Sequence, residues 1–216
     1  MGPRPARTSS AERVVFFTDA VVAIALTLLI LPLLEHVSAA GSEGLTAAEF
    51  LHDRMDSLWV FVFSFVMIAM FWRMHRGLFE GVERVTSLLE TLNAAWMFTI
   101  VVMPVAFALV SAVQADTVQK LVYVGTMMAN AWLLVAMHLE VRRHPELGDD
   151  GQQRRRGGLA ASLALAVLYT VALGIALLIP GGAGYFAMMV MALTSPLQRL
   201  IRKHLPADSS PVLPVG

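Results

Sequence analysis

The feature that most constrains this chain is an almost unbroken apolar run near its amino end, between Arg13 and Leu34. A helix needs roughly 20 apolar residues to cross the hydrocarbon core of a bilayer, and this run is long enough. Inside it stands one acidic residue, Asp19. Because a charge inside a membrane is costly, an ionisable residue there points to a function. The run therefore predicts a membrane protein and indicates where to look for its activity.

The rest of the chain fits the same class of protein. Hydrophobic residues make up 57% of its 216 residues, against roughly 45–50% in ordinary soluble domains. We expect an all-α integral membrane protein. Residues 1–205 should form one transmembrane domain of six helices, and residues 206–216 a disordered tail. Pro104 should kink or locally open the third span. The six predicted spans are Val14–Leu34, Leu58–Met74, Leu88–Val113, Val118–Leu139, Leu159–Ile179 and Tyr185–Leu200.

The positive charges favour one orientation of these six spans. With the amino end in the cytoplasm, 14 of the 16 basic residues lie on the cytoplasmic side, which leaves Arg54 and Lys120 outside. Short loops rich in Lys and Arg stay on the cytoplasmic side of a membrane. The distribution predicts a multi-pass membrane protein with both termini in the cytoplasm.

The sequence lacks the motifs that are typical of several functional classes of protein. The chain has no cysteine, and its histidines lie too far apart for metal-ligand spacing. It shows no P-loop, dinucleotide-binding, zinc-protease or nucleophile-elbow motif. We therefore expect no enzyme activity, no cofactor, no resident metal and no nucleic-acid partner.

Residues 13–19, with the sequence RVVFFTD, resemble the R-x-x-x-F-S-D signature of the transmembrane protein 175 family of potassium channels. The matching positions are Arg13, Phe17 and Asp19, and Thr18 replaces the serine of the family while keeping its hydroxyl. The resemblance resumes at residues 71–76, FWRMHR, which are similar to the end of the second helix of the family. It covers about the first 95 residues of the chain.

The resemblance implies a pore lined by first helices that conducts potassium ions passively. One chain supplies one motif-bearing helix, and a single helix cannot enclose a pore. Endolysosomal members resemble two such units fused, and shorter members occur in prokaryotes. A single unit therefore implies a homotetramer in the lipid bilayer of a bacterial inner membrane. By position, the bulky aliphatic residues of the constriction are Ile24, Leu28 and Leu31.

Helical geometry separates these residues from Asp19. At about 100° per residue, Ile24, Leu28 and Leu31 lie at about 140°, 180° and 120° from Asp19. A stripe that faces a pore therefore turns Asp19 toward its own subunit or a neighbour. Thr27 flanks the stripe, where it either lines the pore or bonds back to the carbonyl of Ala23. The plainer interpretation of the stripe is contact with lipid or with other helices.

Asp19 needs a polar partner, because an unpaired buried carboxylate is costly. The candidates are Arg13, Trp72 and His75, of which the last two share one face near the end of the second span. Asn93 and Asn130 should make hydrogen bonds between helices. The alternative function is a secondary transporter that uses Asp19 as a proton or cation relay. That function predicts a broken helix or an inverted repeat, and the sequence shows neither.

Overall fold

The structure, a computed structural model, describes residues 10–114, 116–148, 152–179 and 201. Within these residues the chain forms helices and no β-strand. The helices are α1 (Ser10–Leu28), α2 (Leu31–Glu43), α3 (Ala47–Asp53), α4 (Met55–Phe79), α5 (Ser87–Ala112), α6 (Thr117–Arg143), the short 3₁₀ helix η1 (Pro145–Leu147) and α7 (Gln152–Leu178).

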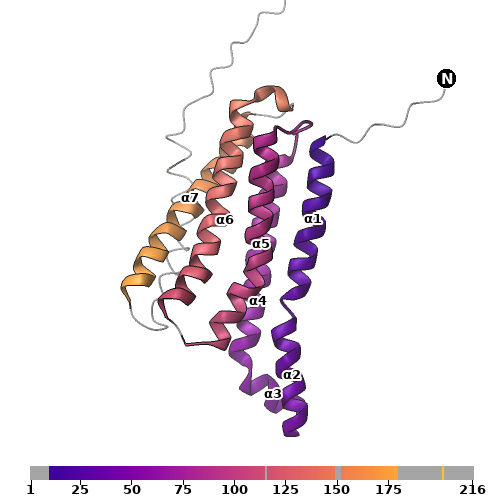
Figure 1. The fold of residues 1–216 in the computed structure, drawn as a ribbon, viewed down its shortest axis with the longest axis vertical. Helices are drawn as coiled ribbons and strands as arrows, with labels where there is room; N and C mark the ends of the chain where they lie inside the picture. The colour runs from indigo at the N-terminus through magenta and orange to yellow at the C-terminus, as the bar shows by residue number, and fades with distance from the viewer. Residues whose placement is uncertain (1–9, 115, 149–151, 180–200, 202–216) are drawn as a thin grey trace, which may run out of the picture.

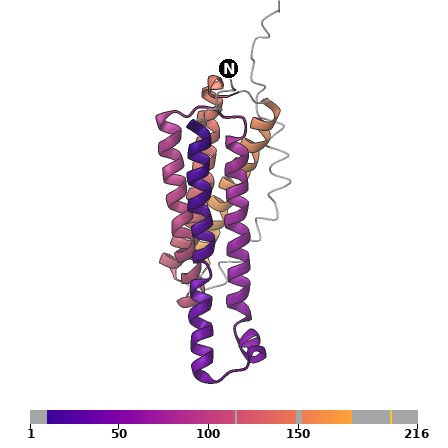
Figure 2. The ribbon, with the colours of Figure 1, turned by 90° about the vertical axis from the view of Figure 1, so that its right-hand side faces the viewer.

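The long helices run up and down beside one another (Figures 1 and 2). Helix α5 packs against α1, α4 and α6, and α7 packs mainly against α6. The start of α1 and the end of α4 lie at the same end of the bundle, together with the start of α5 and the end of α6 (Figure 1). We call this the basic end, because Arg13, Arg76, Arg84 and Arg143 lie there.

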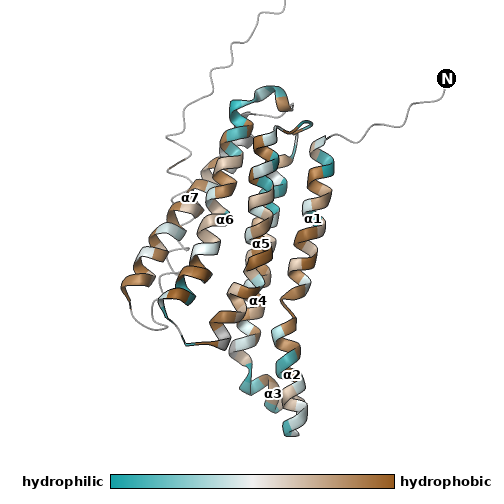
Figure 3. Ribbon diagram, in the orientation of Figure 1, coloured by the Kyte–Doolittle hydropathy of each residue, from teal (hydrophilic) through white to brown (hydrophobic). Residues whose placement is uncertain are grey.

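Five helical segments are long and apolar enough to cross a membrane, namely Ser10–Glu43, Ser57–Phe79, Ser87–Val110, Thr117–Arg143 and Gly157–Leu178. Polar residues gather toward the ends of the bundle and on α3 (Figure 3). The first five predicted spans correspond to these segments. The predicted sixth span, 185–200, and the predicted tail, 206–216, lie outside the described residues.

The first span is not the single continuous helix that we predicted over Val14–Leu34. It divides into α1 and α2 at Leu29 and Ile30, and Pro32 stands in the first turn of α2. Proline has no amide hydrogen, so it removes one backbone bond and favours the start of a helix. Pro104 acts differently, because α5 continues through it from Ser87 to Ala112.

Buried polar side chains between α5 and α6 satisfy one another. The indole of Trp96 donates to the Asn130 Oδ1 atom over 3.0 Å, and the Asn130 amide donates to the Thr99 hydroxyl over 2.6 Å. All three residues are buried. The predicted interhelical role of Asn130 is therefore confirmed.

Lys120, one of the two basic residues that the charge count placed outside, lies in the first turn of α6, at the end of the bundle opposite the basic end, and its side chain is buried. It is 3% exposed, and its ammonium group donates to the carbonyl oxygens of Ala176 and Ile179 at the end of α7. The neighbouring Gln119 donates to the carbonyls of Leu109 and Val113 at the end of α5. The start of α6 thus caps the ends of two other helices, whose last carbonyls have no partner within their own helix.

Candidate functional site: the two faces of the first helix

Helix α1 has one buried and one exposed face. Thr18, Val22, Ala25 and Leu29 recur every three or four residues and are at most 6% exposed. This spacing places them on one side of a helix, and that side packs against α4 and α5. The buried face fixes the rotation of α1 about its axis and so determines what the opposite face presents.

The exposed face carries the predicted constriction residues. Ile24 is 60% exposed, Leu28 39% and Leu31 50%. Ile24 and Leu28 belong to α1, whereas Leu31 begins α2. A row of large aliphatic side chains left uncovered by its own chain is typical of a face that meets another copy, lipid or a pore.

The break between α1 and α2 falls within this row. The amide of Ile30 donates to the carbonyl of Thr27 over 3.3 Å, a tightened turn in place of the usual helical bond. Because Pro32 has no amide hydrogen, it cannot donate to the carbonyl of Leu28, four residues before it. The prediction that one uninterrupted helix carries the whole stripe was therefore wrong at Leu31.

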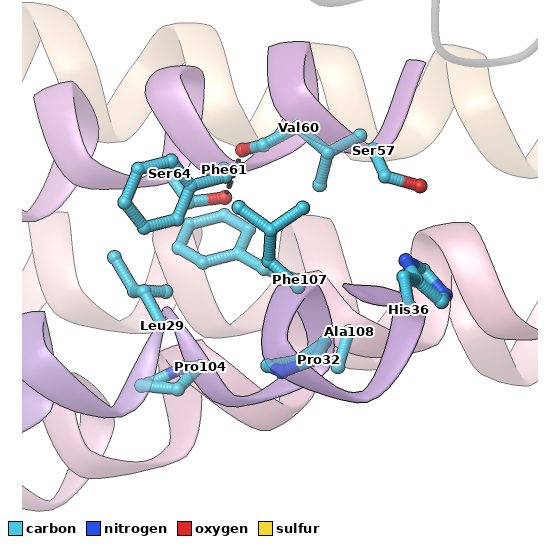
Figure 4. A pocket seen from close by; sticks show the side chains of 11 residues that line it. Leu29, Pro32, His36, Ser57, Val60, Phe61, Ser64, Pro104, Phe107 and Ala108 are labelled. Atoms are coloured by element: carbon cyan, nitrogen blue, oxygen red, sulfur yellow. Dashed lines mark hydrogen bonds between the residues drawn. The ribbon is translucent and has the colours of Figure 1, made fainter. Parts of the chain in front are cut away.

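A small cavity of about 30 Å³ lies behind the break (Figure 4). Leu29 borders it from the turn between α1 and α2, and Pro32 and His36 border it from α2. Phe61 lines it from α4, and Pro104 lines it from α5. The Nδ1 atom of His36 is buried without a hydrogen-bond partner. The break at Pro32 and the proline within α5, Pro104, thus border the same cavity.

Asp19 turns away from the exposed row and toward α4. The Nε1 atom of Trp72 donates to the Asp19 Oδ1 atom over 2.7 Å. The guanidinium of Arg76 lies 3.9 Å from the Asp19 Oδ2 atom and 5.6 Å from the centre of the Trp72 ring. An indole donor, an ion pair and a cation–π contact therefore surround this carboxylate.

His75 binds a different residue. Its Nε2 atom lies 2.6 Å from the Asn93 Oδ1 atom, the Asn93 amide donates to the Thr18 hydroxyl over 2.9 Å, and that hydroxyl donates to the Val14 carbonyl over 2.8 Å. Asn93 thus accepts through its oxygen, so His75 must carry the proton on Nε2. Its Nδ1 atom has no partner. Of the two candidate partners on α4, Trp72 therefore binds Asp19 and His75 does not, and the interhelical role of Asn93 is confirmed.

The aromatic surroundings of His75 explain why its ring stays in place. The ring stacks on Trp96, with centroids 4.3 Å apart, and tilts against Phe79 at 4.8 Å. His75 is fully buried. The His75–Asn93–Thr18 chain therefore joins α4, α5 and α1 inside the bundle, separately from the Asp19–Trp72 pair.

The remaining motif residues lie on or beside the exposed face. Phe17 is 63% exposed. Arg13 lines a hollow with Phe17 and Glu90 and is not brought to Asp19. Thr27 is exposed, and its hydroxyl donates to the carbonyl of Ile24 over 2.7 Å, not to that of Ala23.

Sequence reasoning missed Arg76 as a partner of Asp19. The signal was its position four residues after Trp72, which places both on one face of α4. Among the described residues, no group of His, Asp or Glu side chains is arranged to hold a metal ion.

Residues 13–104 match the model of a family described as the endosomal/lysosomal potassium channel TMEM175. A curated relative from Danio rerio, called an endosomal/lysosomal proton channel TMEM175, is 26% identical over 145 residues, which are 66% of this chain and 27% of the relative. A relative of the same name from Rattus norvegicus is 30% identical over 103 residues, 47% of this chain and 20% of its own. The chain therefore spans less than a third of the length of these relatives.

A solved structure has the same fold. It is a variant of the potassium channel MtTMEM175 in complex with a Nanobody-MBP fusion protein, and it superposes with a TM-score of 0.62 at 17% sequence identity. The match covers 94% of this chain and 98% of that one.

Proposed function

Because this chain belongs to the TMEM175 family, we propose that it is a multi-pass membrane channel that conducts potassium ions passively. The described helices supply the membrane-spanning segments, and we assign the channel to residues 1–205. The positive-inside rule places the basic end of the bundle in the cytoplasm. The name of the solved relative as a potassium channel supports potassium as the ion.

One observation carries the proposal most directly, the uncovered apolar row on α1. Ile24, Leu28 and Leu31 are exposed while the opposite face of the same helix is packed against α4 and α5. One helix cannot surround a path for ions, so the pore requires several copies of α1. We propose four copies around a central axis, with the row facing that axis.

A ring of these side chains provides a physical basis for selectivity. A narrow apolar neck forces an ion to shed part of its hydration shell, and such necks also gate pores by losing water. Potassium holds its hydration shell less tightly than sodium, so the neck opposes potassium less. The sequence contains no motif for a filter lined by carbonyl groups. The apolar neck must therefore discriminate between potassium and sodium.

The break between α1 and α2 is a feature that the transporter alternative predicts, but the contacts of Asp19 do not favour that alternative. A relay carboxylate should face a cavity that opens toward the ion path. Asp19 instead accepts from Trp72, lies beside Arg76 and turns away from the exposed row. The curated relatives are named proton channels, so protons are the second ion to measure.

The proposal is tested with purified protein in liposomes under imposed ion gradients. We expect a potassium gradient to collapse without any proton gradient, faster than a sodium gradient does, and protein-free liposomes to hold both. Potassium flux that requires a proton gradient would support the transporter and contradict the channel. A pH-sensitive dye inside the vesicles measures proton flux in the same preparation.

A further inference from the structure

At the basic end, a junction ties three segments together through backbone groups. Residues 80–86 connect α4 to α5, and the amides of Glu83 and Arg84 donate to the carbonyl of Leu147 over 2.9 and 3.1 Å. The carbonyl of Glu83 accepts from the Ala11 amide and from the Ser10 hydroxyl, each over 3.4 Å. The segment that follows α6 is thereby linked to the first turn of α1, the helix that carries the proposed pore face.

His144 follows the end of α6 and has a carboxylate beside each ring nitrogen. Its Nδ1 atom lies 2.8 Å from Glu146 Oε1, and its Nε2 atom lies 3.5 Å from Glu140 Oε1. A neutral imidazole has one N–H group and an imidazolium has two. The contact with Glu146 is a hydrogen bond, whereas the contact with Glu140 is an ion pair only when the ring is protonated.

The two carboxylates connect His144 to the junction. Glu140 is 5% exposed and accepts from the Thr86 hydroxyl over 2.8 Å. That hydroxyl also accepts from the Leu89 amide over 3.0 Å and so caps the start of α5. Glu146 belongs to η1, whose last residue, Leu147, provides the carbonyl of the junction.

Arg84, a further charged residue at the junction, stabilises the same arrangement. Arg84 donates through Nη2 to the backbone carbonyl of Glu146 over 2.7 Å. A bond from its own backbone amide and the contact with His144 lower the pKa of the Glu146 carboxyl, which keeps it ionised. The charged groups that contact His144 are thus Glu140 on α6 and Glu146 on η1. Arg84 on the loop contacts Glu146, and Arg143 precedes His144 at the end of α6.

We propose that His144 is a pH-sensitive clasp that, when protonated, ties Glu140 to Glu146 and holds the junction against the start of α1. Histidine side chains change charge between about pH 5 and 8. Acidification on this side closes the clasp, and alkalinisation removes the ion pair with Glu140 and leaves only the hydrogen bond to Glu146. The effect on ion conduction rests on the proposed channel function, whereas the clasp itself does not.

Hydrogen exchange of the Glu83 and Arg84 amides tests the clasp directly. The variant His144→Gln keeps a polar side chain that does not titrate, and His52→Gln, on exposed α3, is the matched control. At about pH 6 we expect these amides to exchange about three- to tenfold more slowly in the parent protein than in His144→Gln, and at about pH 8 at nearly equal rates. Equal rates at both pH values, or the same difference at both, would overturn the clasp.

Potassium flux tests the coupling to the pore. We expect flux to change at least twofold between about pH 6 and about pH 8 on the side of the basic end, and this response to disappear in His144→Gln and persist in His52→Gln. A response that is equal in all three proteins would disprove the coupling even if exchange supports the clasp. Absence of any potassium flux in the parent protein would instead contradict the proposed function.

Discussion

The indole of Trp72 donates a hydrogen bond to the carboxylate of Asp19 across 2.7 Å, from the end of α4 to the start of α1. This bond lies on the opposite side of α1 from Ile24 and Leu28. It therefore holds the helix in the rotation that leaves its apolar row exposed. The acidic residue of the motif thus anchors α1 to α4, and in the proposed channel the aliphatic residues on the other side face the pore.

Replacing Asp19 by alanine should weaken the folded oligomer. The change leaves the Trp72 donor without its acceptor, which costs about 1–3 kcal/mol for a buried polar group. Asp19→Asn keeps an oxygen at the same place and should lose less. Thermal unfolding in detergent, read by size-exclusion chromatography, measures both. An Asp19→Ala protein that assembles normally but changes ion selectivity would place Asp19 in the pore and contradict this account.

Replacing Thr18 by serine should leave the stability of the protein nearly unchanged, whereas replacing it by valine should lower it. Its hydroxyl accepts from Asn93 and donates to Val14, and serine keeps both bonds. Thr18→Val has nearly the same shape but leaves the Asn93 amide unpaired, so we expect a loss of about 1–3 kcal/mol in the free energy of unfolding. The same thermal assay compares the two variants, and equal melting temperatures would show that the His75–Asn93–Thr18 chain does not stabilise the bundle.

Lys120→Met should destabilise the end of α7. Methionine has a similar length but cannot donate to the carbonyls of Ala176 and Ile179, so two buried acceptors lose a charged donor. We expect a loss of about 1–3 kcal/mol and faster hydrogen exchange in the last turn of α7. Arg54→Met, at the half-buried residue just before α4, is the control. Unchanged stability in Lys120→Met would show that water replaces the ammonium group at little cost.

The membrane class, most spans and the two faces of α1 follow from local rules. Length and hydropathy identify a span because the bilayer imposes them on each segment separately. The spacing of Thr18, Val22 and Ala25 is a helical period, so the buried side of α1 can be read without any neighbour. Pro32 was a local indication that the first span is interrupted. The prediction of one continuous helix did not use it because the whole run from Arg13 to Leu34 is strongly hydrophobic.

The hydrogen-bond partners and the burial of a side chain depend on how its helix is rotated toward the neighbouring helices. The sequence of a single helix does not specify this rotation. His75 and Trp72 lie on one face of α4, yet one meets Asn93 and the other meets Asp19. The choice is made by the rotation of α5 relative to α4. The burial of Lys120 could not be predicted for the same reason, because it depends on where α7 ends.

The exposed row on α1 should be covered by other copies of the chain. Native mass spectrometry of the protein released from detergent should therefore show a tetramer as the main species. Replacing Ile24 by glutamine, which puts a polar group into the proposed contact, should shift the population toward smaller species. A dominant monomer that still conducts ions would contradict the shared pore.

The central claim is that the exposed row on α1 forms the selective neck of a potassium pore. The most direct measurement is the permeability ratio of potassium to sodium from reversal potentials in a planar bilayer, for the parent protein and for Leu28→Ala. Val22→Ala, on the buried face of the same helix, is the control. We predict a ratio well above one in the parent and in Val22→Ala, and a ratio close to one in Leu28→Ala, because the shorter side chain widens the neck. An unchanged ratio in Leu28→Ala would show that the row does not face the ion path.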